Sequence, residues 1–264
     1  KLMTFPGLYV DVDEFNVRRP GLSDVAVRQA MDYGFDRQAL VHGFFDDKVD
    51  VPDSLIPEAL TYWYDPRIQH YPYDPAKARA ILDAARWKVG PDGIRRKGNT
   101  RLSFELLLNQ GSSLITDEML MWVADMRDIG IDLKLRLIDF ASLSARTYTG
   151  KYDIVVDSRG GIVDPDLTTI LASSQVPPNG ANTTGYADPI VDRDLKLGLV
   201  TIDPAKRRAY YDEMQRELAK TLPLMPQYGR FAATAYAPRL YLDPKTTLQS
   251  PLGYYNVEDW RFTK

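Results

Sequence analysis

The sequence has 264 residues, of which 44% are hydrophobic and 26% are charged, and its formal net charge at pH 7 is −3. This is the composition of a globular protein, and the weak net charge favours neither nucleic acid nor an anionic membrane as a partner. The absence of cysteine excludes disulfides and thiolate catalysis, and the two histidines, His42 and His70, lie far apart in the sequence. We therefore expect no metal site and no cofactor.

The first residues have the pattern of a strand. No apolar run approaches the roughly 18 residues that a membrane-spanning helix needs, and the N-terminus lacks the apolar core of a signal peptide. Apolar residues alternate with polar ones from Leu8 to Phe15 instead, which predicts a strand that the chain enters midway. We expect the chain to be a fragment of a longer protein.

Aspartates predict where several helices begin. Ser23 or Asp24 is suited to cap a first helix, Asp36 a second, and Asp74-Pro75 supplies the N-cap and N1 residues of a third. Residues 51–73 lie between the second and third helices. They are rich in Pro, Tyr and Trp and lack periodicity, which predicts a long ordered loop.

The rest of the chain alternates between strands and helices. The segment GPDGIRRKGN predicts a hairpin, because Gly93 and Gly98 punctuate it and Asp92-Gly93 is a turn signal. The elements predicted after it are a strand over 102–108, a helix over 115–129, a strand over 131–137, a short helix from about Ser142, a strand over 152–156, helices over 187–199 and 204–222, and strands over 225–228 and 232–242. This order predicts an α/β fold, an open sheet flanked by helices.

Polar residues follow the strand predicted over 152–156. They are Asp157, Ser158, Arg159, Gly160 and Gly161, and we predict a turn from Asp157 to Asp164, with Asp164-Pro165-Asp166 opening a helix. Ligands of open α/β sheets bind beyond the carboxyl ends of the strands. A guanidinium beside glycines is suited to hold a ligand carboxylate, so Arg159 is a candidate ligand-binding residue. The alternative is a surface ion pair between Arg159 and Asp157 or Asp164.

The sequence contains no motif of a nucleotide-binding or hydrolytic site. GxGxxG after a strand, the P-loop, GxSxG and HExxH are all absent. A hydrolase or transferase that uses Asp157 and Asp164 as its acids stays open as an alternative. It requires the two carboxylates to converge and to have different pKa values.

Eight motifs, in order, resemble those of the family-5 extracellular solute-binding proteins, the dipeptide-, oligopeptide- and nickel-binding components of ABC importers. The motifs are SDVAVRQAMDYGFDRQALVHGFF, YPYDPAKARAILDAARWKVGPDGIRRKG, MRDIGIDLKLRLID, GKYDIVVD, VDPDLTTIL, NTTGYADPIVDRDL, DPAKRRAYYDEMQRELAKTLPLMPQY and the closing Trp-containing tail. Together they cover nearly the whole chain. The resemblance implies one lobe of a type II periplasmic-binding-protein fold, with a mixed sheet flanked by helices.

The resemblance also implies a function and a domain arrangement. The function is non-enzymatic capture of a peptide or similar small polar solute between two lobes, followed by delivery to permease subunits in the membrane. The full-length protein is then expected to be a bacterial monomer, either periplasmic or anchored at the cell surface. Residues 17–221 are expected to form the C-terminal lobe, residues 1–16 a crossing strand from an N-terminal lobe, and residues 222–264 the return crossover and the final segment of that other lobe. A sensor or chaperone-like relative that binds a partner is a further alternative.

The resemblance carries over to few single positions. Peptide-binding relatives have a Trp in the segment after the YD dipeptide and an Asp four residues before the Pro, and that Asp pairs with the peptide ammonium. Here Gly161 or, with a gap, Ile162 takes the place of the Asp, and no Trp is present, so recognition of a free peptide N-terminus is not implied. The resemblance places Asn109 and Tyr228 at the cleft and gives Asn182 and Tyr186 structural roles. The expected ligand-binding residues are Asn109, Asp157, Ser158, Arg159, Gly160, Gly161 and Tyr228.

Overall fold

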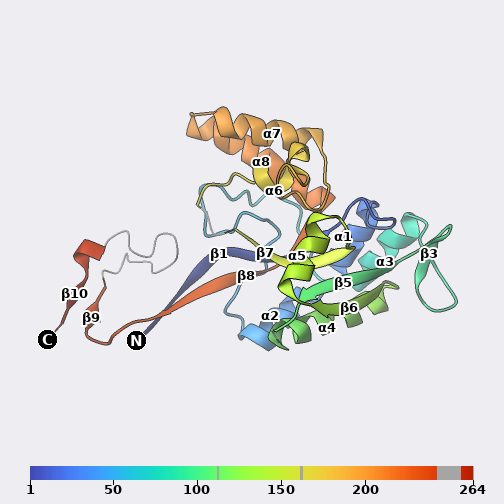
Figure 1. Cartoon of the computed structure of the whole chain (residues 1–264), viewed down its shortest axis with the longest axis horizontal. Coiled ribbons are helices and arrows are strands. Elements are labelled where there is room, and N and C mark those ends of the chain that lie inside the picture. Colours follow the sequence, from blue (N-terminus) through green and yellow to red (C-terminus); the bar gives the residue numbers. More distant parts are fainter. Residues whose placement is uncertain (112, 161–162, 243–256, 264) are drawn as a thin grey trace.

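The computed structural model describes residues 1–111, 113–160, 163–242 and 257–263. Its central element is a five-stranded sheet with the strand order β6-β5-β7-β1-β8 (Figure 1). The strands are β1 (Leu2–Phe15), β5 (Ser103–Asn109), β6 (Asp132–Ile138), β7 (Ile154–Gly160) and β8 (Leu224–Ala235). β5 runs parallel to β6 and β7, whereas β1 runs antiparallel to β7 and β8. The predicted placement of the 102–108, 131–137 and 152–156 strands in one mixed sheet is therefore confirmed.

Helices cover both faces of the sheet. They are α1 (Val25–Tyr33), α2 (Arg37–Phe45), α3 (Pro75–Ala84), α4 (Ser113–Asp128), α5 (Phe140–Tyr148), α6 (Thr168–Leu171), α7 (Pro189–Val200) and α8 (Pro204–Thr221). One face buries Phe15, Ile154 and Met225 against α1 to α4. The opposite face buries Val10 and Val12 against α6, α7 and α8, and α5 packs beside them on Leu107 and Val155. Consecutive residues of a strand therefore enter different cores.

The predicted helix caps are present. The side chain of Asp24 accepts a hydrogen bond from the Ala26 amide of α1, at 3.1 Å, which selects Asp24 over Ser23 as the cap. Asp36 and Asp74 cap α2 and α3 in the same way. Each such cap contributes about 1 kcal/mol, because it satisfies an amide that the helix leaves without a partner. Asp24, Asp36 and Asp74 therefore mark the starts of their helices correctly.

The smaller strands lie outside the central sheet. The predicted hairpin is confirmed: β2 (Lys88–Val89) and β3 (Arg95–Lys97) pair antiparallel, and β4 (Thr100–Arg101) adds a third strand. β9 (Leu240–Tyr241) pairs with β10 (Arg261–Phe262), and the 3-10 helices η1 and η2 span Ser173–Gln175 and Val257–Asp259. The predicted break between a strand over 225–228 and a strand over 232–242 is wrong, since β8 is continuous from Leu224 to Ala235. β1 pairs with β8 from Leu2 to Pro6 and again from Val10 to Glu14, on either side of an irregularity opposite Arg230, and this pairing holds β8 as one strand.

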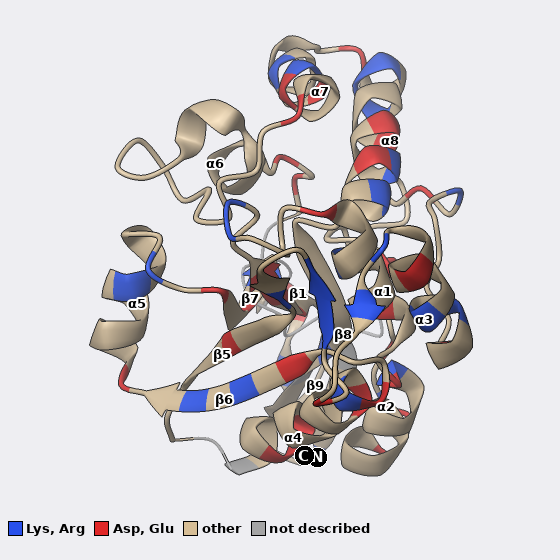
Figure 2. Ribbon diagram, turned by 90° about the vertical axis from the view of Figure 1, so that its right-hand side faces the viewer, with Lys and Arg blue, Asp and Glu red and all other residues tan. Residues whose placement is uncertain are grey.

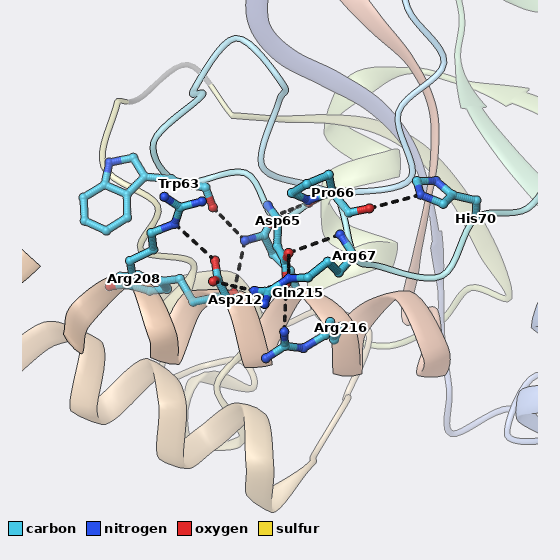
Figure 3. Close-up of polar contacts among 11 residues, drawn as sticks. Trp63, Asp65, Pro66, Arg67, His70, Arg208, Asp212, Gln215 and Arg216 are labelled. Atoms are coloured by element: carbon cyan, nitrogen blue, oxygen red, sulfur yellow. Dashed lines mark hydrogen bonds and ion pairs between the residues drawn. The ribbon is translucent and has the colours of Figure 1, made fainter. Parts of the chain in front are cut away.

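The predicted ordered loop over 51–73 is also confirmed, and side chains of α8 fasten it (Figure 3). Gln215 accepts hydrogen bonds from the Ser54 hydroxyl and the Asp65 amide, and it donates to the Trp63 carbonyl at 2.8 Å. Arg216 pairs with the buried carboxylate of Asp65 at 3.1 Å. Polar contacts with α8 thus hold the loop over 51–73 in place, although the loop forms no helix or strand of its own.

Lys, Arg, Asp and Glu residues recur along the whole length of α8 (Figure 2). Within the described parts of the chain, no helix combines the length and the apolar character that crossing a bilayer requires. The same residues include no cluster of three or more His, Asp or Glu side chains arranged to hold a metal ion.

Candidate functional site

The polar stretch after the buried part of β7 is a strand and not the predicted turn. β7 continues through Gly160 because β1 pairs with it residue by residue, with Val12 opposite Asp157 and Tyr9 opposite Gly160. An added Cβ on Gly160 would lie 2.0 Å from the Leu8 carbonyl oxygen, so the close approach of β1 requires glycine at this position. The predicted site residue Gly161 lies outside the described residues.

The predicted helix start at Asp164 is also wrong. α6 begins at Thr168, and the carboxylate of Asp166 accepts hydrogen bonds from the amide and hydroxyl of that residue. Asp164 forms a turn with the Asp166 amide and a two-point ion pair with Arg207, at 2.8 and 2.9 Å. The hydrogen bond from Arg207 lowers the pKa of Asp164. Asp164 is thus an ion-paired turn residue.

Arg159 lies in an ion-pair cluster on the α7–α8 face of the sheet. Its guanidinium pairs with Asp157 at 3.0 Å and with Glu14 of β1, whose side chain is 1% exposed. The hydroxyl of Thr183 donates to the other carboxylate oxygen of Glu14, at 2.7 Å. Burial raises the pKa of Glu14, although Arg159 opposes this effect. Of the partners expected for Arg159, Asp157 is confirmed, whereas Asp164 pairs elsewhere.

Glu14 is the partner that the sequence analysis missed. It continues the alternation of Val10 and Val12, both fully buried, so its side chain enters the same face of the sheet. An acidic residue at a buried position of an alternating strand indicates that a neighbouring strand supplies a cationic side chain to pair with it. The carboxylates of Asp157 and Asp164 have separate arginine partners, so no converging pair supports the hydrolase alternative.

A second polar cluster lies on the opposite face, where β1 and β8 meet α4. Asp11 lies opposite both Ser158 and Tyr228, and its two carboxylate oxygens accept from the Nε of Arg230, at 2.9 and 2.8 Å. The Tyr228 hydroxyl donates to the fully buried carboxylate of Glu118, at 2.9 Å. Burial raises the pKa of Glu118 to about 7. The sequence analysis named Tyr228 and Ser158 as candidate ligand-binding residues but did not name Asp11, Arg230 or Glu118, the charged residues near them.

Two hollows open beside Arg230. One, of about 250 Å³, lies between β8 and the start of α4 and is bordered by Asp11, Tyr228 and Arg230. The other, of about 710 Å³, lies between the β1–β8 pair and the loops at 47–50 and 57–59. Asn109 is exposed at the carboxyl end of β5, on the same edge of the sheet as Gly160. That edge therefore combines open space with hydrogen-bonding groups.

Two residues that the resemblance treats as structural are part of the framework. Asn182 is fully buried, and its amide nitrogen donates to the carbonyls of Leu171, Ala172 and Tyr186. The Tyr186 hydroxyl is hydrogen-bonded to Thr221 at the end of α8. These contacts hold the α6–α7 connection against α8 and leave neither side chain available to a ligand.

Comparison with known proteins identifies what this chain is similar to. The family model of the bacterial extracellular solute-binding proteins, family 5, matches residues 1–181. Protein XP55 of Streptomyces lividans is 34% identical over 197 residues, which are 74% of this chain and 35% of that protein. A putative ABC transporter peptide-binding protein of Brucella ovis is 28% identical over 230 residues, 79% of this chain and 39% of that protein.

The oligopeptide-binding protein AppA of Bacillus subtilis is similar in both sequence and fold. It is 26% identical over 259 residues, 95% of this chain and 46% of that protein. Its solved structure, in complex with a nonapeptide, superposes with a TM-score of 0.87 at 24% identity and covers 100% of this chain and 52% of that chain. The chain thus spans less than half of the length of these curated relatives. The expected fold, one lobe of the type II periplasmic-binding-protein class, is confirmed.

Proposed function

Because this chain belongs to the bacterial extracellular solute-binding proteins of family 5, we propose that it is part of the solute-binding component of an ABC importer. In this proposal the protein captures a peptide or similar small polar solute and delivers it to permease subunits in the membrane. It is non-enzymatic and monomeric, and it works in the periplasm or at the surface of a bacterial cell. Residues 17–221 form the C-terminal lobe, and residues 1–16 and 222–264 cross to a second lobe.

One observation carries this proposal: open space and polar side chains coincide at one edge of the sheet. The parallel strands β5 and β7 end there in Asn109 and Gly160, and the hollows beside Arg230 adjoin the same edge. An open α/β sheet binds ligands at this position. We propose that Asn109, Asp157, Ser158, Arg159, Gly160, Gly161 and Tyr228 contribute to the ligand-binding surface.

The structure also bears on how these residues would act. The guanidinium of Arg159 has two carboxylate partners, so a ligand carboxylate would have to compete with Glu14 and Asp157. Asp157 is less enclosed, with a side chain that is 44% exposed. We therefore propose that Arg159 mainly positions Asp157, while the more exposed Asp157 and Arg230 face the solute.

The proposal is tested by ligand binding. Thermal-shift screening of the complete gene product against peptides, opines and sugars should raise the melting temperature with at least one solute class, because a ligand that binds only the folded state stabilises it. Calorimetry then measures the affinity. Absence of binding across such a panel, with a selective partner protein captured instead, would favour the sensor or chaperone-like alternative.

A further inference from the structure

The two hollows beside Arg230 meet but differ in character. They share the side chains of Val49, Arg230 and Phe231, so one molecule can occupy both. The smaller hollow is walled mainly by apolar groups, whereas the larger adds several charged side chains, Asp47, Lys48, Asp50, Glu58 and Arg230, to an apolar lining. A ligand that fills both must therefore be amphiphilic.

The smaller hollow is a side-chain pocket. Its walls come from the end of α2, the start of α4 and β8, and they comprise Phe45, Val49, Leu114, Ile115, Tyr228 and Phe231. The rings of Phe45 and Tyr228 pack against each other with centroids 4.7 Å apart, which fixes one wall. Leu114 and Phe231 are 44% and 42% exposed, so their apolar surface faces the hollow without being buried by the chain. A volume of about 250 Å³ accepts one branched or aromatic group.

The cations of the larger hollow are already neutralised. Its lining includes Lys48 and Arg230. Lys48 pairs with Asp46 at 2.9 Å, and Arg230 pairs with Asp11 at 2.7 Å. An anionic ligand would therefore have to displace an existing ion pair.

Of the three acids that line the larger hollow, Asp47 pairs with the His42 imidazole at 2.9 Å, whereas the other two lack such neutralisation in the described part of the chain. Asp47, Asp50 and Glu58 line it, and within the described residues neither Asp50 nor Glu58 forms an ion pair. Asp50 is held against β8, because its carbonyl accepts a hydrogen bond from the Gly229 amide at 2.9 Å. The carboxylates thus leave an excess of negative charge beside the apolar pocket, and this charge favours a cationic ligand group.

From these features we propose that the site selects cationic amphiphilic solutes. An aliphatic or aromatic group enters the smaller hollow, and an ammonium or guanidinium group lies in the larger one near Asp50 and Glu58. Peptides that place a hydrophobic residue next to Lys or Arg have this chemistry. The inference rests on the proposed solute-binding function and adds the chemical class of the solute.

Four matched dipeptides test the inference: Leu-Lys, Leu-Glu, Gly-Lys and Gly-Glu. Their termini are identical, so differences in affinity report the side chains alone. Calorimetry on the complete gene product should rank Leu-Lys first. Leu-Glu and Gly-Lys should each bind about 10-fold more weakly or worse, since one loses the ion pair and the other the apolar contact. The preference for Lys over Glu should shrink at high salt, whereas the preference for Leu over Gly should not.

Variants assign each preference to its residues. Asp50→Asn combined with Glu58→Gln should remove the preference for Lys and keep the preference for Leu. Leu114→Ala should do the reverse. Ile202→Ser, at a side chain that is 96% exposed on the α7–α8 turn, is the matched control and should change neither.

The possible failures are distinguishable. If another solute binds but Leu-Glu equals Leu-Lys, or if the acid variants keep the Lys preference, the inference is overturned and the solute-binding function stands. If no solute of any class binds, the proposed function and the inference both fail.

Discussion

The guanidinium of Arg37 lies 3.1 Å from a carboxylate oxygen of Asp32, and the two side chains are 4% and 1% exposed. Arg37 also pairs with Asp53 at 2.8 Å and donates to the carbonyls of Pro52 and Tyr71, at the two ends of the long loop. α1, α2 and that loop are therefore joined at one buried cation. Among the described residues, no donor forms a hydrogen bond with the Asp32 carboxylate, so its charge is compensated by the ion pair with Arg37.

We expect stability to depend on pH through Asp32. Burial raises the pKa of Asp32 to about 7, against the opposing effect of Arg37. Because the pKa of Asp32 is higher in the folded state, the folded protein holds this proton more tightly than the unfolded chain does. The resulting stabilisation is fully present below about pH 4, the pKa of an Asp in the unfolded chain, and it is lost as the pH rises through about 7. The free energy of unfolding should therefore fall between pH 5 and pH 8 in the wild type, and in Asp32→Asn this fall should be smaller by on the order of 3 kcal/mol. Urea titrations at both pH values measure this, with wild type as the reference, and an unchanged slope would contradict it.

Arg159→Ala should mainly destabilise the fold. Removing the guanidinium leaves the buried Glu14 carboxylate without its cation, a loss of about 3–5 kcal/mol. Adding Glu14→Gln should restore much of that stability, because the uncompensated charge is gone. Chemical denaturation of the single and double variants tests this. A stable Arg159→Ala protein that has lost only solute affinity would instead assign Arg159 to the ligand.

Three glycine-to-alanine changes should differ in the size or the sign of their effect on stability. A Cβ on Gly7 would lie 1.9 Å from the backbone oxygen of Arg230, so Gly7→Ala must displace a strand and should cost roughly 2 kcal/mol or more. A Cβ on Gly229 meets the side chain of Asp50, which can rotate away, so about 1 kcal/mol or less is expected there. Gly43→Ala, in α2 with no neighbour within 4 Å, should stabilise by about 0.5–1 kcal/mol. Thermal denaturation ranks the three, and equal costs at Gly7 and Gly229 would refute the distinction.

Asp164→Ala should have a small effect. The Asp164 carboxylate is 49% exposed, and Arg207 keeps its bond to the Gly198 carbonyl, at 2.8 Å, when the acid is gone. We expect a loss of no more than about 1 kcal/mol of stability and no change in solute affinity. If the protein had a hydrolytic activity and this variant lost most of it, the result would support the alternative of a hydrolase that uses Asp164.

The sequence predicted the elements better than the polar partners. Caps such as Asp24 and Asp74 act within their own helix, so local sequence identifies them. The extension of β7 through Asp157 to Gly160 depends on β1, which lies far away in the sequence, and no local pattern encodes it. The same holds for Glu14 and Arg159, which belong to different strands. Long-range pairing explains most of what sequence reasoning missed.

The order of the strands also constrains when the sheet can form. β1 comes first in the sequence but lies between β7 and β8, and the ion pair of Asp11 with Arg230 joins residues 219 positions apart. Closing so long a loop costs entropy before any pairing repays it, so the centre of the sheet is expected to be a late and slow step of folding. During synthesis on the ribosome, β7 and β8 emerge after β1, so the pairing of β1 with these two strands can form only then. α1 to α4 and the β5–β6 pair, whose contacts are nearer in sequence, are free to assemble first and receive it.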